Sequence, residues 1–490
     1  MRKIISLFFI IVSLGTGCTE GKEIIRQPAF AGTWYPGNRD ELSKTIDSFL
    51  KNARDQQLKG DLIALIAPHA GYAFSGPIAA ESFKQLTGKK FTTVILIGPS
   101  HRYPLRDVSI FDRGYFLTPL GKIKVSEEAS RMVEENPLIK FNPDAHRNEH
   151  CLEIELPFLQ RTLKQFEIIP LLTGEMSLDK CSKVAETIVK HFAIGNTLLV
   201  ASSDMSHYPS YKDATYADKK MLEVIKTLDP DKIASTSKSI LGENIPGLSC
   251  TLCGENAVLT TIIAARKLKA NCVTILKYSN SGDSHPPGWS DKSSVVGYGA
   301  VAITRYPSVS PEAQKELLNL ARKAIKNYLK NKEVLKVTDA SAELSQKLGL
   351  FVTLRLGKDL RGCIGRVEYP APLCEIIGHL SCSAAFDDPR FPPLTEEELE
   401  KIRISVTVCS PLRKISSPDE IIPSLHGVFV KKGKASGLYL PSVWDESGWS
   451  KKEFLRNLCR RKAKLPEDAW KEKDVDLYIF TGHSFSEKQF

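Results

Sequence analysis

Apolar runs and helical segments alternate from Leu62 to about Thr304. Helical periodicity appears between several of the runs, for example from Leu178 to Ala193 and from Ala214 to Leu228. This alternation is typical of an α/β domain with a central, largely parallel sheet. The runs expected to form buried strands are LIALIAPH, TTVILIGPSH, FEIIPLLTG, TLLVASSDMSH, CVTILKYSN and VVGYGAVAIT.

The pattern changes after residues 305–311, which contain two prolines and no apolar periodicity and therefore indicate a linker. An amphipathic helix is expected to begin near Pro311. GLFVTLRLGKDLRGCIG and GVFVKKGKASGLYLP are typical of hairpins, and KIRISVTVCSPL alternates as a half-buried strand does. Residues 312–488 are thus predicted to form a second, α+β domain.

The chain has 490 residues and a net charge of +10. That length exceeds what one hydrophobic core usually serves, which agrees with more than one domain. The basic stretch from Ala321 to Lys336 has apolar residues at helical spacing, so its charge is expected on a solvated helix face. No aromatic-and-basic surface pattern predicts nucleic-acid binding.

The first 18 residues, MRKIISLFFIIVSLGTGC, have a basic start, an apolar centre and small residues before Cys18. This is the pattern of a secretory signal. The cysteine after GTG predicts a lipoprotein-type signal peptide, although Leu14 stands four places before it where three is usual; an ordinary cleaved signal is the alternative. The protein is therefore expected outside the cytoplasm, in the periplasm or cell envelope, touching the membrane only through a lipid anchor.

Eleven cysteines are irregularly spaced in a long chain, so a disulfide scaffold is not predicted. Cys250 and Cys253 form a CxxC pair with no second pair, which argues against a zinc ribbon.

Three apolar runs end in histidine, namely His69, His101 and His207. The carboxyl ends of parallel strands meet at the edge where α/β proteins bind ligands. Two imidazoles and one anionic ligand can hold a divalent metal with open positions. Cys253, just before a strongly helical segment, is the preferred anion because a helix N-terminus favours the thiolate, and Glu255 is the reserve ligand.

The histidine that does not bind metal would serve as a proton shuttle. Asp204, three residues before His207, either orients that ring or caps the following turn. In RNEHCLEIELPFLQ, His150 and Glu153 are expected to share a helix face, with His150 in the pocket. The other histidines of this region are expected at the surface or in loops: His146, His191 and His285.

Five motifs, APHAGYAFSG, GPSH, EHCLEIELPFLQ, SSDMSHY and CGENAV, resemble the Memo family over residues 26–304. That family is similar to class III extradiol dioxygenases in fold and in the position of its metal pocket. The resemblance implies His69, His101 and Cys253 as metal ligands and His207 as the acid/base residue. The dioxygenases have a carboxylate where this sequence has Cys253, and a thiolate suits iron, copper or zinc.

LRGCIG, SAAFDDPRFPPL, GLYLPSVW and KKEFLRNLCRRKA resemble the AMMECR family. The combination resembles systems in which Memo-like, AMMECR-like and radical-SAM proteins occur together, which implies a radical-SAM partner. Cys363 is either a thiol activated by Arg361 or a packed residue of a tight turn. Asp387, Asp388 and Arg390 either line a polar pocket or brace a proline-rich loop.

Three functions follow from these patterns. The first is a metal-dependent redox protein with iron, or else copper, acting on a small-molecule substrate through His207, with Asp204 and His150 beside it. The second is a non-catalytic adaptor or metal carrier that uses the same pocket. The third is a zinc hydrolase, because the same ligands suit zinc with bound water.

Overall fold

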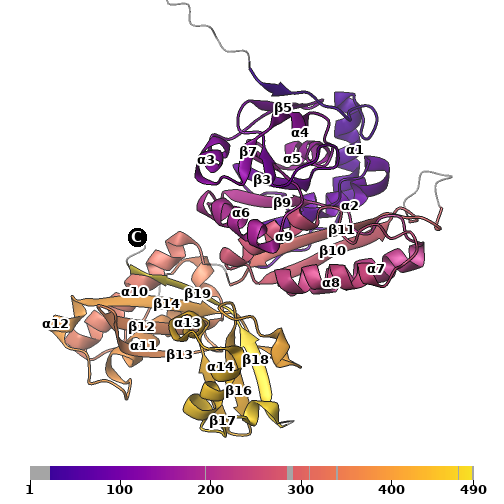
Figure 1. Ribbon diagram of the computed structural model, residues 1–490. Coiled ribbons are helices and arrows are strands. Elements are labelled where there is room, and N and C mark those ends of the chain that lie inside the picture. The colour runs from indigo at the N-terminus through magenta and orange to yellow at the C-terminus, as the bar shows by residue number, and fades with distance from the viewer. Residues whose placement is uncertain are drawn as a thin grey trace, which may run out of the picture.

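The computed structural model describes residues 23–193, 195–283, 291–307, 309–337, 340–472 and 474–487. Two domains follow one another along the chain (Figure 1). The expected signal peptide and His285 lie outside the described residues. None of the described helices combines the length and the apolar character needed to cross a bilayer.

An eight-stranded mixed sheet organises the first domain, with the order β10-β11-β2-β9-β3-β8-β4-β7. The four strands from β2 to β8 in this order run parallel, and β4 and β7 are also parallel to each other. The pairs β10–β11, β11–β2 and β8–β4 are antiparallel. The six apolar runs are all strands of this sheet, as predicted. Its strands are β2 (Asp61–Ala67), β3 (Thr93–Pro99), β4 (Val108–Ile110), β7 (Ile139–Phe141), β8 (Glu167–Thr173), β9 (Thr197–Ser202), β10 (Cys272–Asn280) and β11 (Gly297–Arg305).

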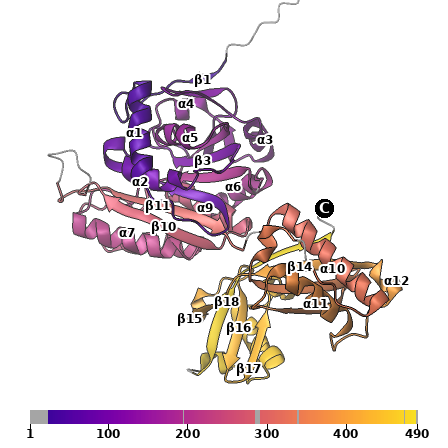
Figure 2. The same cartoon turned by 180° about the vertical axis from the view of Figure 1, so that it is seen from behind.

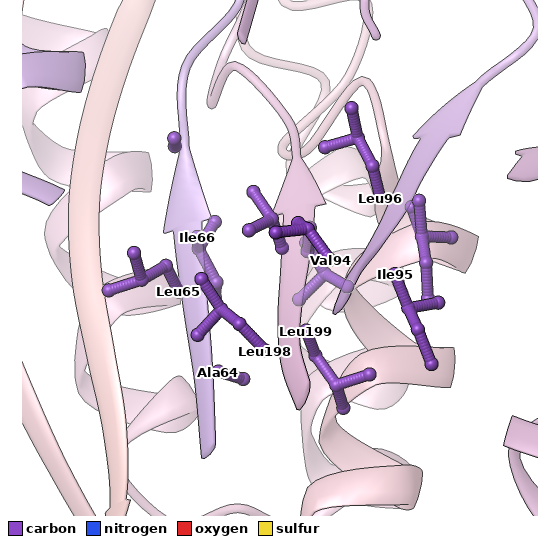
Figure 3. Packing of buried hydrophobic residues seen from close by; sticks show 14 of the residues in the cluster. Ala64, Leu65, Ile66, Val94, Ile95, Leu96, Leu198 and Leu199 are labelled. Atoms are coloured by element: carbon purple, nitrogen blue, oxygen red, sulfur yellow. The ribbon is translucent and has the colours of Figure 1, made fainter. Parts of the chain in front are cut away.

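The sheet core is aliphatic on both faces. All residues of β9 are buried, and so are all but the first of β2, β3 and β8. Figure 3 shows β9 between β2 and β3, with Leu198 and Leu199 beside the aliphatic side chains of the two neighbours. Such runs need cover on both faces, which helices supply.

Serine caps set where two of the covering helices begin. Ser177 and Ser210 accept backbone N–H groups of the first turns of α6 and α7, so α7 starts three residues before the predicted Ala214. Helix α2 packs on α1, and α6 packs on α9. The helices are α1 (Arg39–Asn52), α2 (Tyr72–Lys84), α3 (Glu128–Glu135), α4 (Pro143–Arg147), α5 (Leu156–Thr162), α6 (Leu178–Lys190), α7 (Tyr211–Ile225), α8 (Pro230–Gly242) and α9 (Glu255–Lys267), with a 3-10 turn η1 (Glu153–Glu155).

The second domain is α+β, as predicted, and contains two four-stranded antiparallel sheets, β13-β12-β14-β19 and β15-β18-β16-β17. The expected hairpins are β12–β13 and β16–β17, and helices α10 and α11 pack together (Figure 2). Its strands are β12 (Gly349–Leu356), β13 (Asp359–Arg366), β14 (Ile402–Cys409), β15 (Arg413–Ile415), β16 (Gly427–Lys432), β17 (Ala435–Tyr439), β18 (Asp476–Phe480) and β19 (Gly482–Ser486); its helices are α10 (Pro311–Asn331), α11 (Leu373–Phe386), α12 (Glu396–Leu399), α13 (Ser442–Ser447) and α14 (Lys451–Asn457).

A buried ion pair fastens the N-terminal segment to the first domain. Strand β1 (Ile25–Arg26) joins β5 (Tyr115–Thr118) and β6 (Gly121–Lys124) in a small sheet. The Arg26 guanidinium donates to the Glu153 carboxylate, and both side chains are almost wholly buried. Glu153 also accepts the backbone N–H groups of Ala29 and Phe30, each at 2.9 Å, and the Tyr35 hydroxyl at 2.7 Å. One carboxylate therefore fixes the whole segment from Arg26 to Tyr35.

His146 belongs to this anchor, and its expected place at the surface is wrong. The residue is 1% exposed, and its ring contacts the rings of Phe111 and Phe116. Its carbonyl oxygen accepts the Arg26 Nε–H at 3.0 Å. Burial lowers the pKa of His146 to about 3, so the ring is neutral. Its position depends on long-range packing that residue spacing does not show.

We predict that Glu153→Gln lowers the free energy of unfolding by about 3–5 kcal/mol, because the change leaves the buried Arg26 charge without its counter-ion. Urea denaturation measures the loss, and hydrogen exchange should rise in the peptide that contains Ala29 and Phe30. Glu134→Gln, at an exposed glutamate, is the control. Equal stability of the two variants would show that the ion pair does not anchor the segment.

Candidate metal site

Three neighbouring parallel strands bring polar side chains to one edge of the sheet. His69 follows β2, His101 follows β3, and Asp204 and His207 follow β9. The order β2-β9-β3 makes these strand ends adjacent. The structure therefore brings together the three histidines that the sequence placed at strand ends.

Hydrogen bonds hold the His69 ring at both nitrogens. Nδ1 lies 2.8 Å from Ser202 Oγ, and Nε2 lies 3.1 Å from Cys253 Sγ. The backbone N–H of His69 donates to Asp204 Oδ1 at 2.8 Å. Because His69 is fully buried, its pKa falls to about 3 and the imidazole is neutral. A neutral imidazole has the lone pair that a metal needs.

Glu149 orients His101 and was missed as a site residue by sequence reasoning. Its carboxylate accepts the His101 backbone N–H at 2.7 Å and lies 2.9 Å from His101 Nδ1. Burial opposes ionisation of Glu149, but hydrogen bonds from His101 and His150 outweigh it and hold the pKa well below its usual value. A carboxylate on Nδ1 leaves Nε2 free, which is the usual arrangement of metal-binding histidines. In the sequence, Glu149 stands directly before His150. The rule that a carboxylate supports a metal-binding histidine was the one signal that could have identified Glu149 as a site residue.

His150 lies in the pocket, but the expectation that it shares a helix face with Glu153 is wrong. Its ring stacks on that of His101 with centroids 4.4 Å apart, and it lies 5.3 Å from the His69 ring. Glu153 belongs to η1, a turn later, and points instead to Arg26. A non-helical turn at residues 149–152 separates the two side chains.

Cys253 completes the cluster just before α9. Its Sγ accepts the Asp204 backbone N–H at 3.2 Å. Burial raises the pKa of this thiol well above its ordinary value, so the expectation that the helix N-terminus yields a thiolate by itself is wrong. Desolvation exceeds the helix field here, and a bound cation would have to supply the stabilising charge. Glu255, the reserve ligand, accepts a hydrogen bond from Ser237 at 2.5 Å.

His207 and Asp204 also lie close to Cys253, with donor atoms within 4.8 Å of one another. Asp204 Oδ2 is 3.8 Å from His207 Nε2, too far for a direct hydrogen bond, and this buried nitrogen has no hydrogen-bond partner among the described residues. Burial opposes ionisation of Asp204, but the adjacent His69 and His207 lower its pKa. Asp204 therefore braces His69 through its backbone and supplies negative charge beside His207.

The donor atoms fit a metal ion by their spacing. Three sets each have all their donor atoms within 4.8 Å of one another. One sulfur and two imidazole ligands suit iron, copper or zinc rather than Mg²⁺ or Ca²⁺. The sets are His69 with His101 and Cys253; His101 with Glu149 and His150; and Asp204 with His207 and Cys253.

Aromatic side chains lie against the cluster at His150, and a cavity borders it at Cys253. The anchored N-terminal segment places Trp34 and Phe30 against His150, with ring centroids at 4.5 and 5.5 Å. A cavity of about 700 Å³ reaches Cys253 and is bordered by Tyr103 and Asn256. That volume is ordinary for a small-molecule site.

The remaining predicted residues lie elsewhere. His191 lies in the turn after α6, in agreement with the expected surface or loop position, and its largely buried side chain has Nδ1 2.6 Å from Glu128. In the second domain, Arg361 pairs with Glu398 at 2.8 Å rather than with the Cys363 thiol.

Asp388 and Arg390 brace the backbone of Cys363. Asp388 accepts its N–H at 2.8 Å, and Arg390 donates to its carbonyl oxygen at 3.0 Å. The alternative in which these two residues support the loop therefore matches the observed contacts.

Comparison with known proteins agrees with the two-domain arrangement. Residues 26–302 match the family described as Memo-like protein, and residues 318–485 match AMMECR1. A MEMO1 family protein of Nitrosopumilus maritimus is 34% identical over 284 residues, covering 57% of this chain and 99% of the relative. One from Methanobrevibacter smithii is 35% identical over 291 residues, covering 56% and 98%.

Among solved structures, an uncharacterized protein from Pyrococcus horikoshii is 38% identical, with a TM-score of 0.36, covering 37% of this chain and 94% of that protein. The family matches rest on sequence over more than half of the chain. The chain therefore belongs to the Memo family, and an AMMECR1 domain follows its Memo domain.

Proposed function

We propose that the Memo domain is a metal-dependent redox protein that binds iron, or else copper, through His69, His101 and Cys253. The observation that carries this proposal is the convergence of the three donor atoms within 4.8 Å at one sheet edge. Each histidine of this set is held at Nδ1, His69 by Ser202 and His101 by Glu149. This support is what a preformed metal site requires.

Bound iron would supply redox chemistry toward a small-molecule substrate, which the 700 Å³ cavity beside Cys253 can admit. The protein's own groups surround this position. Nε2 of His207 has no hydrogen-bond partner among the described residues and lies 3.8 Å from Asp204 Oδ2, so this ring is available to take or give a proton. Trp34 and Phe30 keep water from the His150 side.

Two other functions use the same donor set. A non-catalytic adaptor or metal carrier would need the ligands but not His207. A zinc hydrolase would use zinc-bound water in the same pocket. Cys253, in the place where the dioxygenases have a carboxylate, keeps both alternatives relevant because thiolate favours copper and zinc as well as iron.

The proposal also covers the cellular location of the protein and its partner. The basic, apolar and small-residue pattern of residues 1–18 supports an extracytoplasmic protein held at the membrane by a lipid on Cys18. The association of Memo and AMMECR1 domains in one chain supports a functional link to a radical-SAM protein.

We predict near-stoichiometric iron or copper in protein comprising residues 19–490 and purified without oxygen. His69→Ala and Cys253→Ala should each lose most of this metal, since each removes one of three ligands. Cys272→Ala, at a half-buried cysteine outside the cluster, should keep it. Inductively coupled plasma mass spectrometry measures the metal.

The metal that is found separates the alternatives. Zinc lost in the same two variants would favour the hydrolase. A wild-type protein that remains free of metal after reconstitution with each of the three ions would contradict the proposal.

We predict that His207→Gln retains the metal but lowers oxygen uptake with an oxidisable substrate, such as a catechol, by about 10²–10⁴-fold, the usual contribution of a general acid or base. An oxygen electrode measures the rate, and His191→Gln is the control. Wild-type uptake no faster than that of the variant would instead favour the adaptor or carrier.

A further inference from the structure

Behind His69 lies a set of buried polar groups that the proposed function does not use. Ser202, the last residue of β9, has its hydroxyl oxygen 2.8 Å from His69 Nδ1, 2.7 Å from the Cys151 carbonyl oxygen and 2.9 Å from Glu155 Oε1. Ser202 and Glu155 are both 0% exposed. Water does not reach these groups, so they must satisfy one another.

Counting hydrogens leaves one arrangement in which all three contacts are hydrogen bonds. A serine hydroxyl has one proton to donate and two lone pairs that accept. The Cys151 carbonyl can only accept, so it must receive the Ser202 proton. His69 Nδ1 and Glu155 must then both donate to Ser202 Oγ.

We propose that Glu155 is a neutral carboxylic acid and that, with Ser202, it presents His69 to the pocket as the Nδ1–H tautomer. Nε2 then carries the lone pair and faces Cys253 Sγ, 3.1 Å away. Ser202 and Glu155 are positioning residues, since neither belongs to the three donor sets of the pocket. The inference deepens the metal site proposed above.

The surroundings of Glu155 favour the neutral form. Its second oxygen, Oε2, is buried and has no hydrogen-bond partner among the described residues. An ionised carboxylate in that position would leave charge unsolvated and add to the negative charge of Asp204. Burial raises the pKa of Glu155 well above its ordinary value, in agreement with the hydrogen count.

A neutral acid has a consequence for the charge of the site. The negative charge close to a bound cation then comes from Cys253 and Asp204 on the pocket side, and from Glu149 behind His101. Glu155 fills the space behind His69 and directs Ser202 without adding charge. Replacing it by the isosteric, neutral glutamine should therefore leave the electrostatics of the site unchanged.

The first test uses the metal-free full chain, with Glu155→Gln to assign the infrared band. ¹⁵N NMR of histidine-labelled protein should show His69 protonated on Nδ1. Infrared spectroscopy at pH 7 should show the C=O stretch of a protonated carboxylic acid, and Glu155→Gln should remove that band. A proton on Nε2 of His69, or the absence of the band, would overturn the inference.

The second test measures affinity for Co²⁺ by optical titration. Ser202→Ala should weaken binding by about 10–100-fold, the usual effect of losing such a supporting partner. Glu155→Gln should bind as wild type does, because its amide N–H can donate to Ser202. Ser75→Ala, which removes a buried hydroxyl bonded to the Ala70 carbonyl, is the control.

The two tests separate this inference from the proposed function. If Glu155→Gln weakens Co²⁺ binding as much as Ser202→Ala does, Glu155 is ionised and the inference is wrong. Suppose that the wild-type protein binds neither Co²⁺ nor iron, copper or zinc, but its metal-free NMR and infrared spectra are as expected. The proposed metal function then fails, while the protons assigned to His69 Nδ1 and Glu155 stand.

Discussion

Buried polar groups at the ends of β2, β9 and β3 are the constraint on which the first domain depends. Strands covered on both faces exclude water, and His69 and Asp204, just beyond the ends of β2 and β9, are still only 1% and 4% exposed. Each such group costs a few kcal/mol unless it is paired. The pairs that result, Asp204 with the His69 backbone and Ser202 with its ring, fix the positions of the donor atoms.

The same principle extends outward from the strand ends. Glu149 pairs with His101, and Glu153, four residues later, pairs with Arg26. The second pair anchors the N-terminal segment, which in turn places Trp34 against His150. The paired carboxylates of Glu149 and Glu153 thus connect the metal pocket to β1. The aromatic wall of the pocket depends on an ion pair that does not touch the pocket.

Strand-based reasoning was enough to find the histidines, but not the groups that orient them. The carboxyl ends of parallel strands share one sheet edge, so His69, His101 and His207 could be placed together from sequence. Glu155 could not be placed from sequence, and Glu149 only by the rule that a carboxylate supports a metal-binding histidine. Both lie in the turn and 3-10 segment around residues 149–155, where helical spacing does not hold.

Two of the errors have one physical origin. The thiol of Cys253 was judged from the helix that follows it, and His146 from its neighbours in the chain. Burial decides both, and it depends on packing between distant segments. By contrast, the two hairpins of the second domain were predictable because their contacts are local.

X-ray absorption at the edge of the bound metal tests the central claim most directly. The account predicts one sulfur neighbour, at about 2.3 Å if the metal is zinc, with two imidazole nitrogens at about 2.0–2.1 Å. Cys253→Ala should have no sulfur neighbour in any metal that it retains. A metal bound by oxygen and nitrogen alone in the wild-type protein would contradict the account.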